Sequence, residues 1–179
     1  LNYTLSWTGN KKTIRGDSGH TVKGHGTHVA GTMLGGGIKD NRYRGMAPDS
    51  RLITYEWTET NTEIYNELRD ASGNYDSILS QNSWGLNVHN DCNLMGDYRW
   101  RSAAYDNISS GRANQKAISV IFSAGNERST GTDSNGDDYC VAKGYTYNTT
   151  TGPGGTAKNT ITVGAVDSSS NMNSFSSWG

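Results

Sequence analysis

Hydrophobic residues along this chain gather in a few short runs that are separated by long polar stretches. The clearest runs are rich in β-branched or aromatic side chains and are bounded by Gly, Asn or Asp, which is typical of strands. The predicted strands cover residues 52–57, 78–84, 118–124 and 160–166.

Helical patterns fill two of the intervals between these strands. Apolar residues recur at helical spacing within residues 62–71 and again within residues 98–110. Strands that alternate with helices indicate βαβ units, so we predict an α/β fold with a doubly wound, mostly parallel sheet flanked by helices. Ligands of such folds bind beyond the carboxyl ends of the strands, which points to residues 83–85 and 125–126.

Two long segments, residues 85–96 and 127–155, are crowded with Asn, Asp, Gly, Ser and Thr and are predicted to be surface loops. Each holds one of the two cysteines, Cys92 and Cys140, and neither cysteine has a neighbour at zinc-ligand spacing. A disulfide and two unpaired thiols both fit this pattern. A disulfide would close a loop of ~49 residues and contribute roughly 4 kcal/mol in the chain-entropy model.

The composition narrows the class of protein. Hydrophobic residues make up 32% of the 179 residues and Gly is present 23 times, so the core must come from few, concentrated segments. The net charge of -1 argues against a nucleic-acid partner, and every apolar run is shorter than the ~20 residues that cross a bilayer. The chain starts at Leu1 with no targeting pattern, so we expect it to be part of a longer sequence.

Residues 24–32 carry the richest local signal, Gly-His-Gly-Thr-His-Val-Ala-Gly-Thr. A helix that starts near His25 would put Val29 and Met33 on one face, and its small residues would allow close packing against a sheet. The histidine would then be exposed on the first turn of the helix. An imidazole there can act as a general base, because it titrates near neutral pH.

This block resembles the active-site histidine signature of the subtilisin-like serine proteases, the subtilases. Further segments resemble those of the same family in the same chain order: Gly-Met-Ala-Pro at residues 45–48, Asn-Ser-Trp-Gly at 82–85, Phe-Ser-Ala-Gly-Asn-Glu at 122–127, Thr-Ala-Lys-Asn at 156–159 and Phe-Ser-Ser-Trp-Gly at 175–179. The resemblance implies a subtilisin-like fold and a secreted serine endopeptidase that acts on peptides or proteins.

The resemblance also implies roles for single residues. His25 matches the catalytic base, and Asn126 matches the residue whose side-chain amide donates to the oxyanion of the tetrahedral intermediate. The residues that match segments pairing with an extended peptide and lining its first side-chain pocket are Ser83, Trp84, Gly85, Ser123, Ala124 and Gly125. No cofactor or metal ion is implied for catalysis.

Two members of the catalytic triad have no match in this sequence. The family's serine lies in a Gly-Thr-Ser type segment, and no such segment is present up to Gly179. Asp17 stands in an Asp-Ser-Gly triplet like that of the family's aspartate, but it follows residues 11–16 rather than an apolar strand, and it lies too close to His25. We therefore interpret Asp17 as a surface-loop residue and expect the catalytic aspartate upstream of Leu1.

These departures lead us to expect that residues 1–179 are the central portion of a single subtilisin-like peptidase domain. The incomplete chain would be inactive by itself and would leave sheet and helix surfaces uncovered. A complementary fragment or a second copy of the chain is therefore an expected partner.

Two other functions stay open at this point. A non-catalytic relative would keep the peptide-binding segment at residues 83–85 without ever having had a nucleophile. A divalent-metal hydrolase would use His25 and His28, although a third ligand is not evident and the resemblance gives His28 a structural role.

A structural calcium site is a separate question. Asp133, Asn135 and Asp137 alternate around Gly136 as in a calcium loop, but the full twelve-residue pattern is missing. A solvated turn is the favoured interpretation of this segment, and structural calcium stays open.

Overall fold

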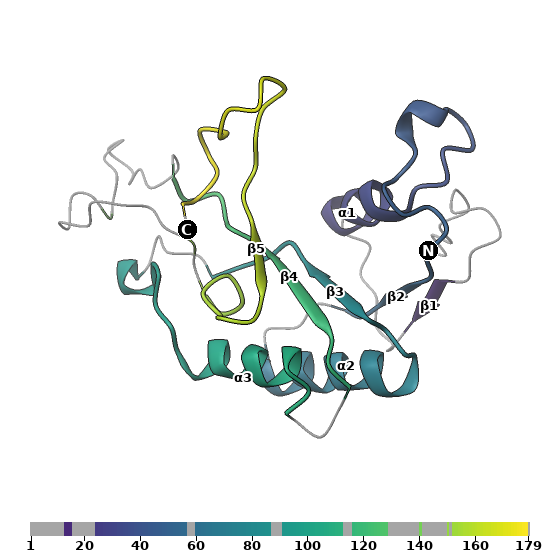
Figure 1. The fold of residues 1–179 in the computed structure, drawn as a ribbon. Helices are drawn as coiled ribbons and strands as arrows, with labels where there is room; N and C mark the ends of the chain where they lie inside the picture. Colours follow the sequence, from purple (N-terminus) through teal and green to yellow (C-terminus); the bar gives the residue numbers. More distant parts are fainter. Residues whose placement is uncertain are drawn as a thin grey trace. The chain divides into compact units, whose positions relative to one another are not determined.

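The computed structural model describes residues 13–15, 24–56, 60–86, 91–112, 116–128, 140, 150 and 152–178. The chain divides into two compact units, Leu1–Ala71 and Ser72–Gly179. Figure 1 labels the helices and strands of both. Among the described residues, no helix has the length and apolar character needed to cross a membrane.

The first unit contains short strands and helices in alternation. In chain order these are β1 (Thr13–Arg15), α1 (Gly24–Leu34), the 3₁₀-helix η1 (Asn41–Tyr43), β2 (Leu52–Thr54) and the greater part of α2 (Asn61–Asn74). Strands β1 and β2 pair in parallel. At its end, β2 is tied to α2 by a hydrogen bond of 2.7 Å from the Tyr55 hydroxyl to the Asp70 carboxylate.

Strand β1 was not expected from the sequence, because it has three residues and Ile14 is its one apolar side chain. Its presence weakens one of the two reasons for setting Asp17 aside, since a strand precedes that residue, although it is not an apolar one. The short spacing from Asp17 to His25 is unchanged. Asp17 itself lies outside the described residues.

The carboxyl end of α1 is closed by the segment that follows it. The backbone N–H groups of Met46 and Ala47 donate to carbonyls in the last turn of α1 at 3.1 and 2.7 Å, which satisfies acceptors that the helix leaves unpaired. A Cβ on Gly45 would lie 2.5 Å from the backbone nitrogen of Gly35. The Gly-Met-Ala-Pro segment therefore needs its glycine in order to pack on the helix that carries His25.

The second unit is built around a three-stranded parallel sheet with the strand order β3-β4-β5. Its elements are β3 (Leu79–Asn82), the 3₁₀-helix η3 (Cys92–Leu94), α3 (Trp100–Ser109), β4 (Ser119–Ser123) and β5 (Ile161–Val163). Helix α3 packs against β4. Parallel strands connected through helices confirm the predicted α/β fold class, and the four predicted strands are all present in shorter form.

Phe122 lies at the centre of the second unit's core. It is 1% exposed, as is Val120, because alternate residues of β4 face the core. The Phe122 ring meets the rings of Trp84 and Tyr105 edge to face, with centroids 5.2 and 5.0 Å apart. A Cβ on Gly154 would overlap the Phe122 ring, so the backbone of that turn packs directly on the aromatic side chain.

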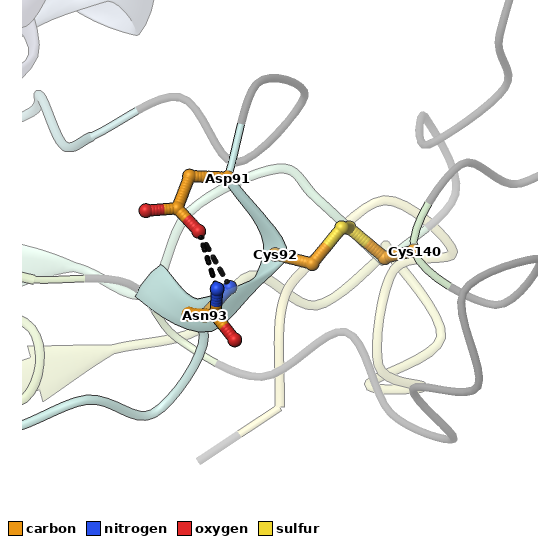
Figure 2. The surroundings of a disulfide bond; sticks show 4 residues. All are labelled: Asp91, Cys92, Asn93 and Cys140. Carbon is orange, nitrogen blue, oxygen red and sulfur yellow. Dashed lines mark hydrogen bonds between the residues drawn. A yellow bond between two sulfur atoms is a disulfide. The ribbon is translucent and has the colours of Figure 1, made fainter.

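The prediction that residues 85–96 and 127–155 are surface loops is wrong for several of the residues that the structure describes. Cys92 and Cys140 are buried and form a disulfide, which decides between the two alternatives that the sequence left open (Figure 2). Residues 152–155 are buried as well. Their glycines suggested a loop, but here the absence of side chains allows close packing on the core.

The 3₁₀-helix η3 presents Cys92 to its partner. Its first turn is capped by the Asp91 carboxylate, which accepts hydrogen bonds from the backbone N–H and the side-chain amide of Asn93 at 3.1 and 2.9 Å (Figure 2). The cap therefore fixes the backbone conformation directly before Cys92.

Reduction of the disulfide is expected to lower the free energy of unfolding by about 4 kcal/mol, because the bond closes a long loop in the unfolded chain. The bonded cysteines are 48 positions apart. Urea unfolding with and without a thiol reductant measures the change, and a Cys92→Ser, Cys140→Ser double variant that no longer responds to reductant is the control. Equal unfolding midpoints in both conditions would contradict the expectation.

Replacement of Gly154 by alanine is expected to destabilise the chain by about 1–3 kcal/mol or more, because the new methyl group has no space beside Phe122. Gly73 is a matched control on α2, where an added Cβ has no neighbour within 4 Å. Gly73→Ala should be neutral or stabilise by up to about 1 kcal/mol, because alanine favours the helix. Equal effects of the two substitutions in thermal unfolding would be inconsistent with this packing.

Candidate active site

Two of the sequence-predicted segments start from the carboxyl edge of the sheet. In the β3–β4 pair Asn82 lies opposite Phe122, so the chain leaves both strands at the same level. Residues 83–85 and the residues that follow Ser123 therefore start from the same edge of the sheet. The structure thus places at this edge the two segments that contain Ser83, Trp84, Gly85, Ser123, Ala124 and Gly125. The roles of these residues remain predictions.

A polar network from Asn82 fixes the first of these segments. The Asn82 amide donates to the Ser80 hydroxyl at 2.9 Å and to the Ile121 carbonyl on β4 at 3.3 Å, and its oxygen accepts the Trp84 indole N–H at 3.2 Å. Asn82 is 9% exposed, so these bonds replace the water that it loses on burial. They hold the Trp84 ring against Phe122.

A third segment beside this edge, residues 152–156, was not predicted from the sequence. The backbone N–H of Leu86 donates to the carbonyl of Gly152 at 3.1 Å, which joins this buried turn to the segment that follows β3. The Thr156 hydroxyl lies 3.0 Å from the hydroxyl of Ser102, a buried residue of α3. The only sequence signal was the Thr-Ala-Lys-Asn motif that begins at Thr156.

Asp106 on α3 fixes the far end of that motif. Its carboxylate accepts a hydrogen bond of 2.6 Å from the backbone N–H of Asn159 and one of 2.7 Å from the Tyr98 hydroxyl. The hydrogen bond to Asp106 raises the pKa of Tyr98, aided by burial and by the negative charge. Helix α3 thereby anchors the chain that enters β5.

Asn126 stands in the turn directly after β4. Gly125 before it has a φ of +103°, a backbone conformation that strongly favours glycine. Asn126 is exposed, and its backbone N–H donates to the Glu127 carboxylate at 2.6 Å. Glu127 also contacts Ser177, and neither of these two residues was predicted from the sequence as part of a site.

His25 is the second residue of α1 and is exposed there, as the sequence predicted. His25 is therefore not part of the hydrophobic core. His28 on the same helix is exposed as well. If His28 has the structural role that the resemblance implies, it is not as a buried packing residue. His25 belongs to the first unit and Asn126 to the second, and the structure describes each within its own unit.

The described residues contain no group of three or more His, Cys, Asp or Glu side chains that could hold a metal ion. They therefore supply no further ligands for the metal-site alternative at His25 and His28. The proposed calcium-loop residues Asp133, Asn135 and Asp137 lie outside the described residues.

Comparison with known proteins identifies the family. No curated protein matches the chain. The model of the subtilase family matches residues 3–179, which is nearly the whole sequence and includes every segment on which the resemblance rests. The chain therefore belongs to the subtilase family, whose members are serine peptidases.

Proposed function

We propose that the chain supplies the peptide-binding edge, the general base and the oxyanion donor of a serine endopeptidase. The observation that carries this proposal is the family match over residues 3–179. The catalytic serine and the aspartate that orients the base would come from sequence outside these residues, as the missing Gly-Thr-Ser segment suggests.

Substrate binding would use the carboxyl edge of β3 and β4. An extended peptide can add to backbone groups there as a further strand, and its side chains then enter pockets at alternate positions. Two features support this role. The segments after β3 and β4 start from the same edge of the sheet, and Gly85 in the first of them is exposed, so the backbone there is accessible.

His25 would take the proton from the attacking serine and return it to the leaving amine. Its surroundings suit that task. The adjacent Gly24 and Gly26 are exposed and have open space where a side chain would be, so the imidazole is accessible to a substrate. Small neighbours of this kind allow a peptide to approach the first turn of α1.

Asn126 would donate its side-chain amide to the oxyanion that forms when the carbonyl is attacked. Support comes from its exposure at the end of β4, next to the proposed peptide-binding segment. A donor that is already fixed in place costs no reorganisation when the charge develops, which is why such residues lower the barrier of the chemical step.

Secretion is part of the proposal. Disulfides persist in oxidising compartments, and the Cys92–Cys140 bond fits such a location. No cofactor is required for the proposed chemistry, because proton transfer and charge stabilisation are carried by side chains.

The proposal is tested with the protein expressed together with the sequence that flanks residues 1–179 in its gene. His25→Ala should lower kcat for a peptide amide by at least about 10⁴-fold. Asn126→Ala should lower kcat by about 10²–10³-fold, a cost measured on subtilisin, a member of the same family. Asn107→Ala replaces another exposed asparagine, on α3, and should leave kcat unchanged.

Other results of this experiment would contradict the proposal. Hydrolysis that survives His25→Ala would remove the histidine from the mechanism. Loss of activity with a chelator, together with stoichiometric metal bound at His25 and His28, would favour the metal-hydrolase alternative. Binding of peptide without hydrolysis would favour a non-catalytic peptide-binding relative.

The 179-residue chain by itself is expected not to hydrolyse peptide amides, because its sequence lacks the Gly-Thr-Ser segment of the nucleophile. A fluorogenic peptide assay on the purified chain measures this. Hydrolysis that disappears with His25→Ala would show that another residue of the chain acts as the nucleophile.

A further inference from the structure

The turn that carries Asn126 is held by hydrogen bonds at three successive residues. The Gly125 carbonyl accepts from the backbone N–H of Ser177 at 3.0 Å. The Asn126 N–H donates to the Glu127 carboxylate at 2.6 Å, and the Glu127 N–H donates to the Ser177 hydroxyl oxygen at 3.1 Å. Two residues, Glu127 and Ser177, therefore supply every partner in this set.

The two side chains also meet each other. The Ser177 hydroxyl lies 3.4 Å from the Glu127 carboxylate and donates to it. Ser177 is 1% exposed, so water does not compete for its hydroxyl. A Cβ on Gly125 would lie 2.5 Å from the Glu127 carboxylate and 3.2 Å from the Ser177 hydroxyl. Glycine at position 125 is thus needed for the two side chains to reach the backbone.

Ser177 is itself fixed, because the segment around it is bound to the sheet. The neighbouring Ser176 accepts a hydrogen bond of 2.9 Å from the backbone N–H of Ala165, just beyond β5. Arg128 adds a second link, since its guanidinium lies over the Trp178 ring at 4.8 Å and donates to the Asn173 carbonyl at 3.3 Å. The turn after β4 is therefore anchored to a rigid support.

We infer that Glu127 and Ser177 are positioning residues that hold Asn126 for oxyanion stabilisation, an inference that rests on the proposed function of Asn126. We call this pair the Glu127–Ser177 latch. The latch touches the backbone of Asn126 and leaves the chemistry to its side-chain amide. Its effect follows from geometry, because a displacement of about 1 Å in an active site can cost about 10²-fold in rate.

The latch is tested first by amide hydrogen exchange of Asn126, measured by NMR on the protein that carries the flanking sequence. Glu127→Ala removes the acceptor and should speed exchange of the Asn126 N–H by about tenfold. Glu127→Gln keeps an acceptor oxygen and should preserve most of the protection. Ser177→Ala should speed exchange of the Glu127 N–H instead.

Asp167→Ala is the matched control. The Asp167 carboxylate also accepts backbone N–H groups, from Asn171 at 2.9 Å and Ser169 at 2.8 Å, which lowers the pKa of Asp167. It belongs to the same unit as the latch but shares none of these hydrogen bonds with it. Its removal should speed exchange at Ser169 and Asn171 and leave the Asn126 N–H protected.

Steady-state kinetics on the same variants tests the role in catalysis. Glu127→Ala should lower kcat by about tenfold to a hundredfold with little change in KM, because the effect is on the transition state. Glu127→Gln should recover most of the loss, and Asp167→Ala should leave kcat unchanged. In the background of Asn126→Ala, the Glu127→Ala substitution should have no further effect, because the latch acts through Asn126.

The results of these experiments distinguish a failure of the latch from a failure of the proposed function. Fast exchange of the Asn126 N–H in the wild-type protein would overturn the latch, whether or not the protein hydrolyses peptides. If Glu127→Ala lowered kcat as much in the Asn126→Ala background as in the wild-type protein, the inference that the latch acts through Asn126 would be overturned. A protected N–H in a wild-type protein without hydrolysis would overturn the proposed function and with it the catalytic role of the latch.

Discussion

Parallel pairing of β3, β4 and β5 is the constraint on which the second unit depends. Strands that run in the same direction end at the same edge of the sheet, so the segments after β3 and β4 both start from that edge. The strands are short, and β3 is mostly polar, with the sequence Leu-Ser-Gln-Asn. Burial of apolar side chains therefore holds only part of the sheet, and hydrogen bonds from Asn82 to both strands hold another part.

The same contacts that stabilise this unit also place the residues proposed to act on a peptide. Phe122 faces the core while the chain after it turns toward the proposed site, and its ring supports both Trp84 and the turn at Gly154. Asn126 lies beyond this rigid base, in a turn tied to Ser177. An exposed donor on a buried support is the arrangement that electrostatic stabilisation of a transition state requires.

Periodicity in the sequence was sufficient to predict the α/β class, the strands β2 to β5 and the three α-helices, because each lies in a segment of regular pattern. It was not sufficient for β1, whose three residues include one apolar side chain. The spacing of the cysteines could not decide whether a disulfide forms. The glycines of residues 152–155 favoured a surface loop, so the buried turn there was not predicted. The Glu127–Ser177 latch could not be predicted from local sequence pattern, because the two residues are 50 positions apart in the chain.

The central claim is that the carboxyl edge of β3 and β4 binds an extended peptide. Hydrogen exchange of the chain with and without a cleavage-resistant peptide tests it most directly, because a peptide that adds as a strand takes up backbone N–H groups. Binding of the peptide as an added strand should protect residues 83–85 and 123–126. Protection confined to other segments, or none at a saturating peptide concentration, would contradict it.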